Sequence, residues 1–382
     1  MRIAFYAPLK APDHGIPSGD RTVARLLVAA LKHAGHQVEL ASRLRSRDGA
    51  GDPVRQRRLA ALGARLAARL LRRYEARPPA ARPRAWLTYH LYYKAPDWIG
   101  PRVCRALGIP YVVAEASLAA KRADGPWAMG HEATLAALSA ARAVIALNPA
   151  DVPALPAGTP MHRLAPFLDP APYRAAHESR ASTRAQLAMA HGLDPTAPWL
   201  LSAAMMRADA KLASYRCLGA ALRQVADRPW HLLIAGDGPA RAAVRAAFAW
   251  AETGRVVYLG MPDEHELPEI YGACDLYAWP AVNEAYGMAL LEAQAAGLPV
   301  LAGAAGGVAS VVGHGETGVL VPPGDERAFA QALGALLDDP SRRRALGAAA
   351  LKRVAARHGL DRAARDLDAI FSAAGLRASE AP

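Results

Sequence analysis

Two glutamates, Glu284 and Glu292, lie eight residues apart across the start of a predicted helix. Glu284 falls in a loop after a buried strand, and Glu292 falls inside the helix, which the apolar spacing predicts to end at Gly297. The first amides of a helix lack an intrahelical acceptor and attract phosphate. Here they belong to Gly287, Met288, Ala289 and Leu290. Because carboxylates accept strong hydrogen bonds from hydroxyl groups, the segment is expected to bind a ligand with hydroxyls on both sides of its phosphates, such as a nucleotide sugar.

Two basic residues follow an earlier candidate strand. Arg207 and Lys211 stand four residues apart, just after the apolar run Trp199–Ala203. Cations held in place near a reacting diphosphate stabilise the charge that grows in the transition state. The alternative interpretation is an ordinary surface pair, since the chain is rich in arginine.

The glutamate segment resembles the E-x7-E signature of the family 4 retaining glycosyltransferases, which have the GT-B fold. The matching letters are E-A-Y-G at 284–287, E-A at 292–293, G-L-P-V at 297–300 and the glycine-containing runs at 306–307 and 315–325. The resemblance implies that Glu292 binds the nucleotide ribose and that Glu284 contacts the transferred sugar. It further implies that the backbone from Tyr286 to Ala289 holds the sugar and the diphosphate.

The same resemblance assigns Arg207 and Lys211 to the donor diphosphate. It also implies that the loop around Gly19 approaches the donor phosphate and the acceptor, although this chain has one glycine there where many relatives have two. Ser18 is the predicted N-cap of the helix that follows. Many relatives carry a histidine after the fourth strand, where this chain reads A-E-A-S at 114–117. We therefore treat Glu115 and His90 as further candidates for the same cleft, against the alternative that both are structural.

These residues must be held by a scaffold, and the chain alternates short apolar runs with helical patterns. Runs that are apolar throughout are typical of strands in a parallel sheet covered on both faces, so the fold class is α/β. With the resemblance, we expect a GT-B fold of two Rossmann-like parallel-sheet domains facing an interdomain cleft. The predicted strands are 2–7, 37–41, 85–89, 111–115 and 143–147, then 199–203, 231–235, 256–259, 275–279, 299–302 and 319–321.

A proline-rich segment divides the two sets of strands. Residues 165–172 contain three prolines and cannot form regular helix. We expect an N-terminal, acceptor-side domain at 1–165 and a C-terminal, nucleotide-sugar-binding domain at 166–382, whose last helix is a candidate to cross back. The final helical region, from about 326 to 374, is expected to break near Pro340.

The segment Arg55–Arg84 combines ten arginines with leucines at three- and four-residue spacing. This pattern predicts an amphipathic helix with a basic face. Attachment to an anionic membrane surface is one interpretation, and a solvated arginine face is the other. The net charge of +12 is compatible with either, and with phosphate-bearing substrates.

Composition excludes several classes. The three cysteines form no CxxC motif or Cys/His cluster, so a zinc site or disulfide framework is not expected. No metal is expected, and no cofactor is expected beyond the donor substrate. The N-terminal apolar run is too short for a signal peptide, and no run of about 18 apolar residues predicts a membrane span. The expected location is cytoplasmic, with the inner face of the membrane as the site of peripheral attachment.

The sequence thus predicts a retaining, hexosyltransferase-type glycosyltransferase that acts on a saccharide, a lipid or a cell-envelope glycan. One alternative is a nucleotide-sugar epimerase or hydrolase on the same fold. Another is a non-catalytic basic protein that binds membrane or RNA, although no RNA-binding motif is present and nucleic acid is not an expected partner. The donor base, the donor sugar, the acceptor and the linkage are not specified by the sequence.

Overall fold

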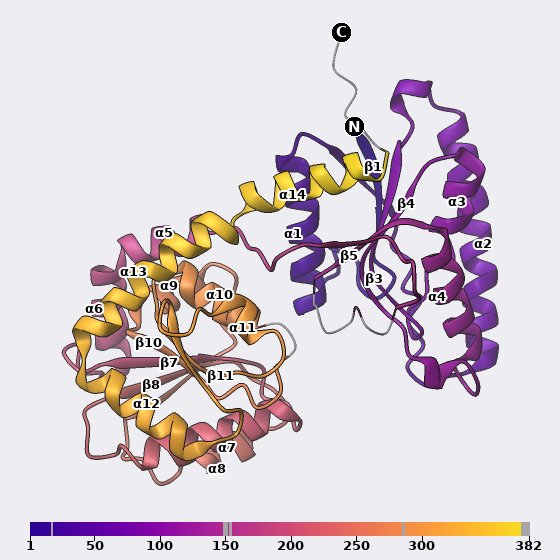
Figure 1. The fold of residues 1–382 in the computed structure, drawn as a ribbon. Helices are drawn as coiled ribbons and strands as arrows, with labels where there is room; N and C mark the ends of the chain where they lie inside the picture. Colours follow the sequence, from indigo (N-terminus) through magenta and orange to yellow (C-terminus); the bar gives the residue numbers. More distant parts are fainter. Residues whose placement is uncertain (17, 148–151, 153–154, 285–286, 376–382) are drawn as a thin grey trace. The chain divides into compact units, whose positions relative to one another are not determined.

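The computed structural model describes residues 1–16, 18–147, 152, 155–284 and 287–375. The chain divides into two compact units (Figure 1). Unit 1 comprises residues 1–165 together with the segment from Leu360 onward, and unit 2 comprises Pro166–Gly359. The final helix of the described chain therefore belongs to the unit that contains the N-terminus.

Unit 1 is built on a six-stranded parallel sheet with the order β2-β1-β3-β4-β5-β6. In Figure 1, α1 and α14 cover one face of this sheet, and α2, α3 and α4 cover the other. The strands are β1 (Arg2–Tyr6), β2 (Gln37–Ser42), β3 (Ala85–Tyr92), β4 (Tyr111–Ser117), β5 (Ala141–Ala146) and β6 (Met161–Arg163). The helices are α1 (Gly19–His33), α2 (Pro53–Glu75), α3 (Gly100–Leu107), α4 (Ala128–Ala140) and α14 (Leu360–Ala373), with the short 3-10 turns η1 (Pro79–Ala81) and η2 (Ala120–Arg122).

Unit 2 repeats this architecture with the strand order β12-β11-β10-β7-β8-β9, also entirely parallel. Its strands are β7 (Trp199–Ala203), β8 (His231–Ala235), β9 (Val256–Gly260), β10 (Leu276–Trp279), β11 (Val300–Gly303) and β12 (Gly318–Val321). Its helices are α5 (Ala171–Glu178), α6 (Arg180–His191), α7 (Ala210–Arg223), α8 (Arg241–Ala247), α9 (Glu266–Ala273), α10 (Met288–Ala295), α11 (Val308–Val311), α12 (Glu326–Asp338) and α13 (Pro340–Arg357).

The α/β class with two Rossmann-like parallel sheets is confirmed, and each of the eleven predicted strands is present. Strand β6 was not predicted, because it is only three residues long and two of them, His162 and Arg163, are polar. The final helical region breaks at Pro340 as predicted. It breaks a second time between α13 and α14, at His358 and Gly359.

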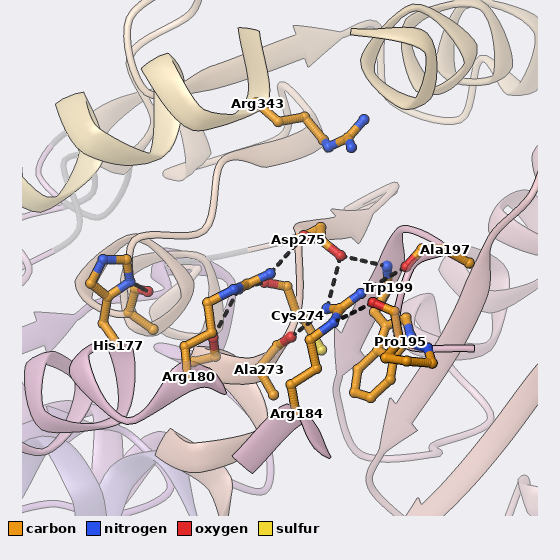
Figure 2. Close-up of polar contacts among 12 residues, drawn as sticks. His177, Arg180, Arg184, Pro195, Ala197, Trp199, Ala273, Cys274, Asp275 and Arg343 are labelled. Atoms are coloured by element: carbon orange, nitrogen blue, oxygen red, sulfur yellow. Dashed lines mark hydrogen bonds and ion pairs between the residues drawn. The ribbon is translucent and has the colours of Figure 1, made fainter. Parts of the chain in front are cut away.

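An acidic residue at the amino edge of unit 2 ties several elements together (Figure 2). Asp275 lies just before β10 and pairs with Arg180 at 2.6 Å and with Arg184 at 3.0 Å, both from α6. Its carboxylate also accepts the amide of Trp199, the first residue of β7, at 2.8 Å. Both guanidinium groups donate to backbone carbonyls at the end of α9 as well. These contacts fix the starts of the central strands β7 and β10 to the helices α6 and α9.

The predicted basic amphipathic helix is α2, which runs from Pro53 to Glu75. Its apolar stripe, including Ala67, Leu70 and Tyr74, is buried against unit 1. Its arginines, 55, 57, 58, 65, 69, 72 and 73, are all exposed, and Glu75 is its only acidic residue. Within the described residues, no helix has the length and apolar content that crossing a bilayer requires.

Candidate functional site

The carboxyl edge of the unit 2 sheet is tightly packed at two glycines. A Cβ on Gly236 would lie 2.0 Å from the carbonyl oxygen of Ala204, and one on Gly238 would lie 2.4 Å from that of Met206. Both glycines also have positive φ, so only glycine lets the turn after β8 approach the loop after β7 this closely. The packing fixes the loop that carries Arg207.

Lys211 and Glu284 form an ion pair across this edge, with 2.5 Å between Nζ and Oε2. Lys211 is in the first turn of α7, where Asp209 caps the helix by accepting its amide at 2.9 Å. Glu284 also accepts a hydrogen bond from the indole of Trp279 at 3.3 Å, and the ammonium lies 5.4 Å from the centre of that indole. The sequence predicted both residues to belong to the site, and the structure shows that they contact each other.

Arg207 has a different environment. Its side chain is exposed, and its guanidinium contacts the sulfur of Met205 at 3.0 Å. Among the described residues its hydrogen bonds do not reach Lys211 or Glu284, and it forms no ion pair. The structure therefore leaves this cation accessible at the same edge of the sheet.

Glu292 points from α10 toward a group of tyrosines. Its carboxylate accepts a hydrogen bond from Tyr271 of α9 at 3.0 Å and another from Tyr173 of α5. Burial among these rings raises the pKa of Glu292 to about 7, and the two hydroxyls oppose that rise. A carboxylate that hydroxyl groups already solvate is suited to accept the hydroxyls of a ribose.

One buried ring connects the two glutamates. Tyr277 in β10 stacks on Tyr271 with 5.8 Å between ring centres, and its hydroxyl hydrogen-bonds to the carbonyl of Ala203 at 3.1 Å. Burial raises the pKa of Tyr277, and the negative charges of both Glu284 and Glu292 raise it further. Both carboxylates therefore act electrostatically on one buried phenol.

The start of α10, the helix that bears Glu292, is formed by a glycine N-cap and small or half-buried residues. Gly287 is the N-cap of α10 with φ 76°, a left-handed conformation that favours glycine. A Cβ there would also lie 2.9 Å from the side chain of Leu290. Met288 and Ala289 are half-buried and open the helix, whereas the amide of Leu290 donates to the carbonyl of Gly287 at 3.0 Å. Tyr286 lies outside the described residues. The helix was predicted to end at Gly297, whereas its C-cap is Ala296 and Gly297 follows with φ 76°.

In unit 1, Gly19 is the first residue of α1, and Ser18 caps the helix as predicted by accepting the amide of Arg21 at 3.3 Å. A Cβ on Gly19 would meet no atom within 4 Å, so packing inside unit 1 does not require glycine there. The neighbouring Asp20 pairs with His90 at 2.9 Å. That hydrogen bond holds the pKa of Asp20 below its ordinary value.

Two candidates in unit 1 have an unusual backbone. His90 has φ 61° within β3, and Glu115 has φ 59° within β4. Residues with a Cβ seldom adopt this conformation, and where they do they cluster at functional sites. Sequence reasoning named both residues but had no means of detecting the strain.

The sequence analysis did not identify several residues that contact the candidate site residues. The tyrosines that hold Glu292, Tyr173 and Tyr271, are 119 and 21 residues away from it in sequence, and nothing in their local pattern marks them. The Asp20–His90 pair is separated by 70 residues and was missed for the same reason. No group of three His, Cys, Asp or Glu side chains within the described ranges is arranged to hold a metal ion.

Part of the sequence matches known glycosyltransferases. The sequence profile of the family described as "Glycosyl transferases group 1" matches residues 198–339. The chain is 41% identical over 169 residues to a D-inositol 3-phosphate glycosyltransferase of Thermobispora bispora, which is 41% of this chain and 39% of that protein. The chain thus spans less than half the length of the curated relatives it matches.

Solved structures are similar over nearly the whole chain. A sucrose-phosphate synthase from Thermosynechococcus elongatus superposes with a TM-score of 0.70 at 23% identity, covering 97% of this chain and 98% of that one. Anabaena HepE in complex with UDP-glucose superposes with a TM-score of 0.67 at 18% identity, covering 97% and 99%. At these identities the likeness concerns the fold.

Proposed function

Because residues 198–339 match the sequence profile of the group 1 glycosyltransferases, we propose that the protein is a retaining glycosyltransferase with a nucleotide-diphosphate sugar as donor. The two parallel sheets have the GT-B fold. We propose that unit 2 binds the donor and that unit 1 binds the acceptor, which is a saccharide, a lipid or a cell-envelope glycan. The donor is the only small molecule that the reaction requires besides the acceptor.

One observation carries this proposal: an ion-paired Lys211 and Glu284 and a tyrosine-held Glu292 lie around one buried ring, beside the start of α10. Glu292 accepts the ribose hydroxyls, and the amides that open α10 receive the diphosphate. The donor's phosphates attract the Lys211 ammonium away from Glu284, which frees that carboxylate for a hydroxyl of the transferred sugar. The accessible Arg207 supplies a second cation.

The reaction breaks the bond between the sugar's anomeric carbon and the diphosphate oxygen. The acceptor hydroxyl forms its bond to that carbon on the same face, so the configuration is retained. The acceptor's proton passes to a donor phosphate oxygen, which leaves as part of the nucleotide. Lys211 and Arg207 stabilise the negative charge that accumulates on that group.

Binding and hydrolysis of UDP-glucose test the proposal, because this donor is bound by Anabaena HepE. We expect Glu292→Gln to weaken nucleotide-sugar binding in calorimetry by about tenfold or more, since a charged acceptor is lost. Lys211→Met should slow turnover more than it weakens binding. The matched controls are Glu269→Gln, an exposed position on α9, and Arg216→Met, an exposed position on α7.

If the site variants bind and turn over UDP-, GDP- and ADP-sugars as the controls do, the site assignment is wrong. An epimerase or hydrolase on the same fold is distinguished by product analysis with the donor alone. A transferase gives little product until an acceptor is added, whereas an epimerase gives a new nucleotide sugar and a hydrolase gives free sugar.

We also propose that α2 attaches the protein peripherally to an anionic membrane. Its exposed arginines present a nearly unopposed positive face, and each such residue near an anionic surface contributes about 1 kcal/mol. Co-sedimentation with phosphatidylglycerol vesicles should fall when Arg65 and Arg69 are changed to Glu. The same changes at Arg344 and Arg357 of α13 should have little effect. Equal binding to phosphatidylcholine vesicles would contradict an electrostatic attachment.

A further inference from the structure

A group of aromatic rings with two cations lies at the carboxyl edge of the unit 1 sheet, and the proposed donor site does not use it. Tyr93 and Lys94 follow β3, whereas Arg122 and Trp127 follow β4. The rings of Tyr93 and Trp127 are 5.9 Å apart in an edge-to-face arrangement. Parallel α/β sheets bind their ligands at this edge. We call these four residues the aromatic-cation cluster.

Both cations lie over both rings. The Arg122 guanidinium carbon is 4.7 Å from the centre of Trp127 and 5.6 Å from that of Tyr93. The Lys94 ammonium is 5.2 Å and 5.8 Å from the same two centres. Neither cation forms an ion pair with any residue that the structure describes, and the buried Nε of Arg122 has no hydrogen-bond partner there. Ring faces offset only part of the repulsion between two like charges, so this pair of cations favours the binding of an anion.

The cluster is held rigidly from behind. A Cβ on Gly130 of α4 would lie 2.1 Å from the carbonyl oxygen of Tyr93, so only glycine allows this close packing. The buried side chain of Gln56 hydrogen-bonds to the carbonyl of Pro126 at 2.7 Å and to the amide of Gly130 at 3.2 Å. The indole of Trp127 donates to the carbonyl of Asp48 at 3.2 Å. Unit 1 thus fixes the rings with hydrogen bonds and packing before any ligand arrives.

The cluster continues toward polar groups along the same edge. Tyr92 lies between Tyr93 and His90, with ring centres 5.7 Å and 5.1 Å away respectively. His90 in turn pairs with Asp20. The surface therefore offers two cations at one end and hydroxyl, imidazole and carboxylate groups at the other, with half-buried rings between them.

We propose that the aromatic-cation cluster is the acceptor site, and that the acceptor is a polyhydroxylated ring bearing a phosphate. Lys94 and Arg122 bind the phosphate, since an ammonium and a guanidinium together match its oxygens. The C–H face of the sugar or cyclitol ring packs against Tyr93 and Trp127, as apolar surface does on aromatic rings. Its hydroxyls reach toward Asp20 and His90. This assignment rests on the proposed glycosyltransferase function and specifies the substrate class.

The test measures binding to the full-length protein by calorimetry. Glucose 6-phosphate and inositol phosphate are the phosphorylated probes, with glucose and inorganic phosphate as the partial ones. We expect each phosphorylated ring to bind more tightly than either partial probe and to weaken with added salt. Arg122→Gln and Lys94→Gln should each weaken it about tenfold or more, whereas Arg105→Gln, an exposed arginine of α3, should not.

Two further variants separate the roles of ring and charge. Trp127→Leu should weaken binding of the phosphorylated ring and leave binding of inorganic phosphate unchanged. Arg122→Lys should keep much of the affinity that Arg122→Gln loses.

Vesicles that contain phosphatidylinositol, compared with vesicles of phosphatidylcholine alone, present the same phosphorylated ring on a membrane. Binding of the free probe alone identifies a soluble acceptor. Binding only to phosphatidylinositol, lost in Arg122→Gln, identifies a lipid headgroup.

UDP-glucose binding in the same samples keeps the two proposals apart. If the donor binds but wild-type protein binds no phosphorylated ring in either form, the acceptor assignment is overturned and the glycosyltransferase function stands. The same holds if Arg105→Gln weakens binding as much as Arg122→Gln. If no nucleotide sugar binds, the proposed function itself fails.

Discussion

Replacing Glu292 by glutamine should stabilise the protein at alkaline pH while it damages donor binding. The pKa of Glu292 is about 7, against an ordinary value of 4.5, because the carboxylate is buried among tyrosine rings. A carboxyl group whose pKa is raised by folding binds its proton more tightly in the folded state. The wild-type protein therefore loses stability as the pH rises from 4.5 to 7, and the loss is constant above that window.

The size of the effect follows from the two pKa values. A difference of about 2.5 between them corresponds to about 3 kcal/mol at pH 8.5, and to under about 1 kcal/mol at pH 5. Although the carboxylate itself is buried, the Glu292 residue as a whole keeps some exposure to solvent, so screening makes 3 kcal/mol an upper value. Glutamine cannot ionise and keeps an oxygen that can accept from Tyr271. For a unit of about 200 residues, the gain at pH 8.5 amounts to roughly 6–12 °C in Tm.

The assay is thermal unfolding of wild type and Glu292→Gln across pH 5 to 8.5, followed by tryptophan fluorescence. The difference in Tm should be small at pH 5, grow through neutral pH and then level off. Glu269→Gln, at an exposed position, should show no such growth. A Tm difference that is the same at every pH would refute the reasoning, because it would mean that Glu292 ionises in the folded protein as readily as in the unfolded chain.

Three further changes probe other parts of the structure. Lys211→Met should lower kcat/KM for UDP-glucose by about 10²–10³, because a preorganised cation is removed and Glu284 loses its partner; an unchanged kcat would argue against transition-state stabilisation. Gly130→Ala should destabilise unit 1 by about 1–3 kcal/mol in urea unfolding, since the new methyl group meets the Tyr93 carbonyl; wild-type stability would show that α4 can shift freely. Asp275→Asn should cost about 2–3 kcal/mol in unit 2 by leaving the two α6 arginines without their carboxylate (Figure 2); loss of donor binding without loss of stability would contradict this structural role.

The sequence predicted the sheets well because the central strands, such as β3, β4, β7 and β10, are buried on both faces. The runs Trp199–Ala203 and His231–Ala235 are apolar almost throughout, and the observed strands β7 and β8 have the same bounds. Where a strand is short and polar, as in Met161–Arg163, the pattern contains no such signal. Helix ends shifted by a residue or two, because a cap depends on the local backbone as well as on composition.

The candidate site was predictable where its residues are close in sequence. Glu284, Gly287 and Glu292 belong to one strand-loop-helix unit, whose geometry follows from its spacing. The contact between Lys211 and Glu284 joins residues 73 positions apart and depends on how α7 packs beside β10. Left-handed backbone at His90 has no signature in the sequence either. Contacts made by tertiary packing required the structure.

The membership of α14 in unit 1 affects how the chain folds during synthesis. Its buried Leu367 and Phe371 pack with α1 and the region around His36, and Asp361 pairs with His33 at 2.6 Å. A ribosome produces all of unit 2 between residue 165 and this helix. The apolar surface of α1 that α14 covers must therefore stay exposed on the nascent chain until about 200 further residues have emerged. During that period the exposed surface is prone to aggregation and is a target for chaperones.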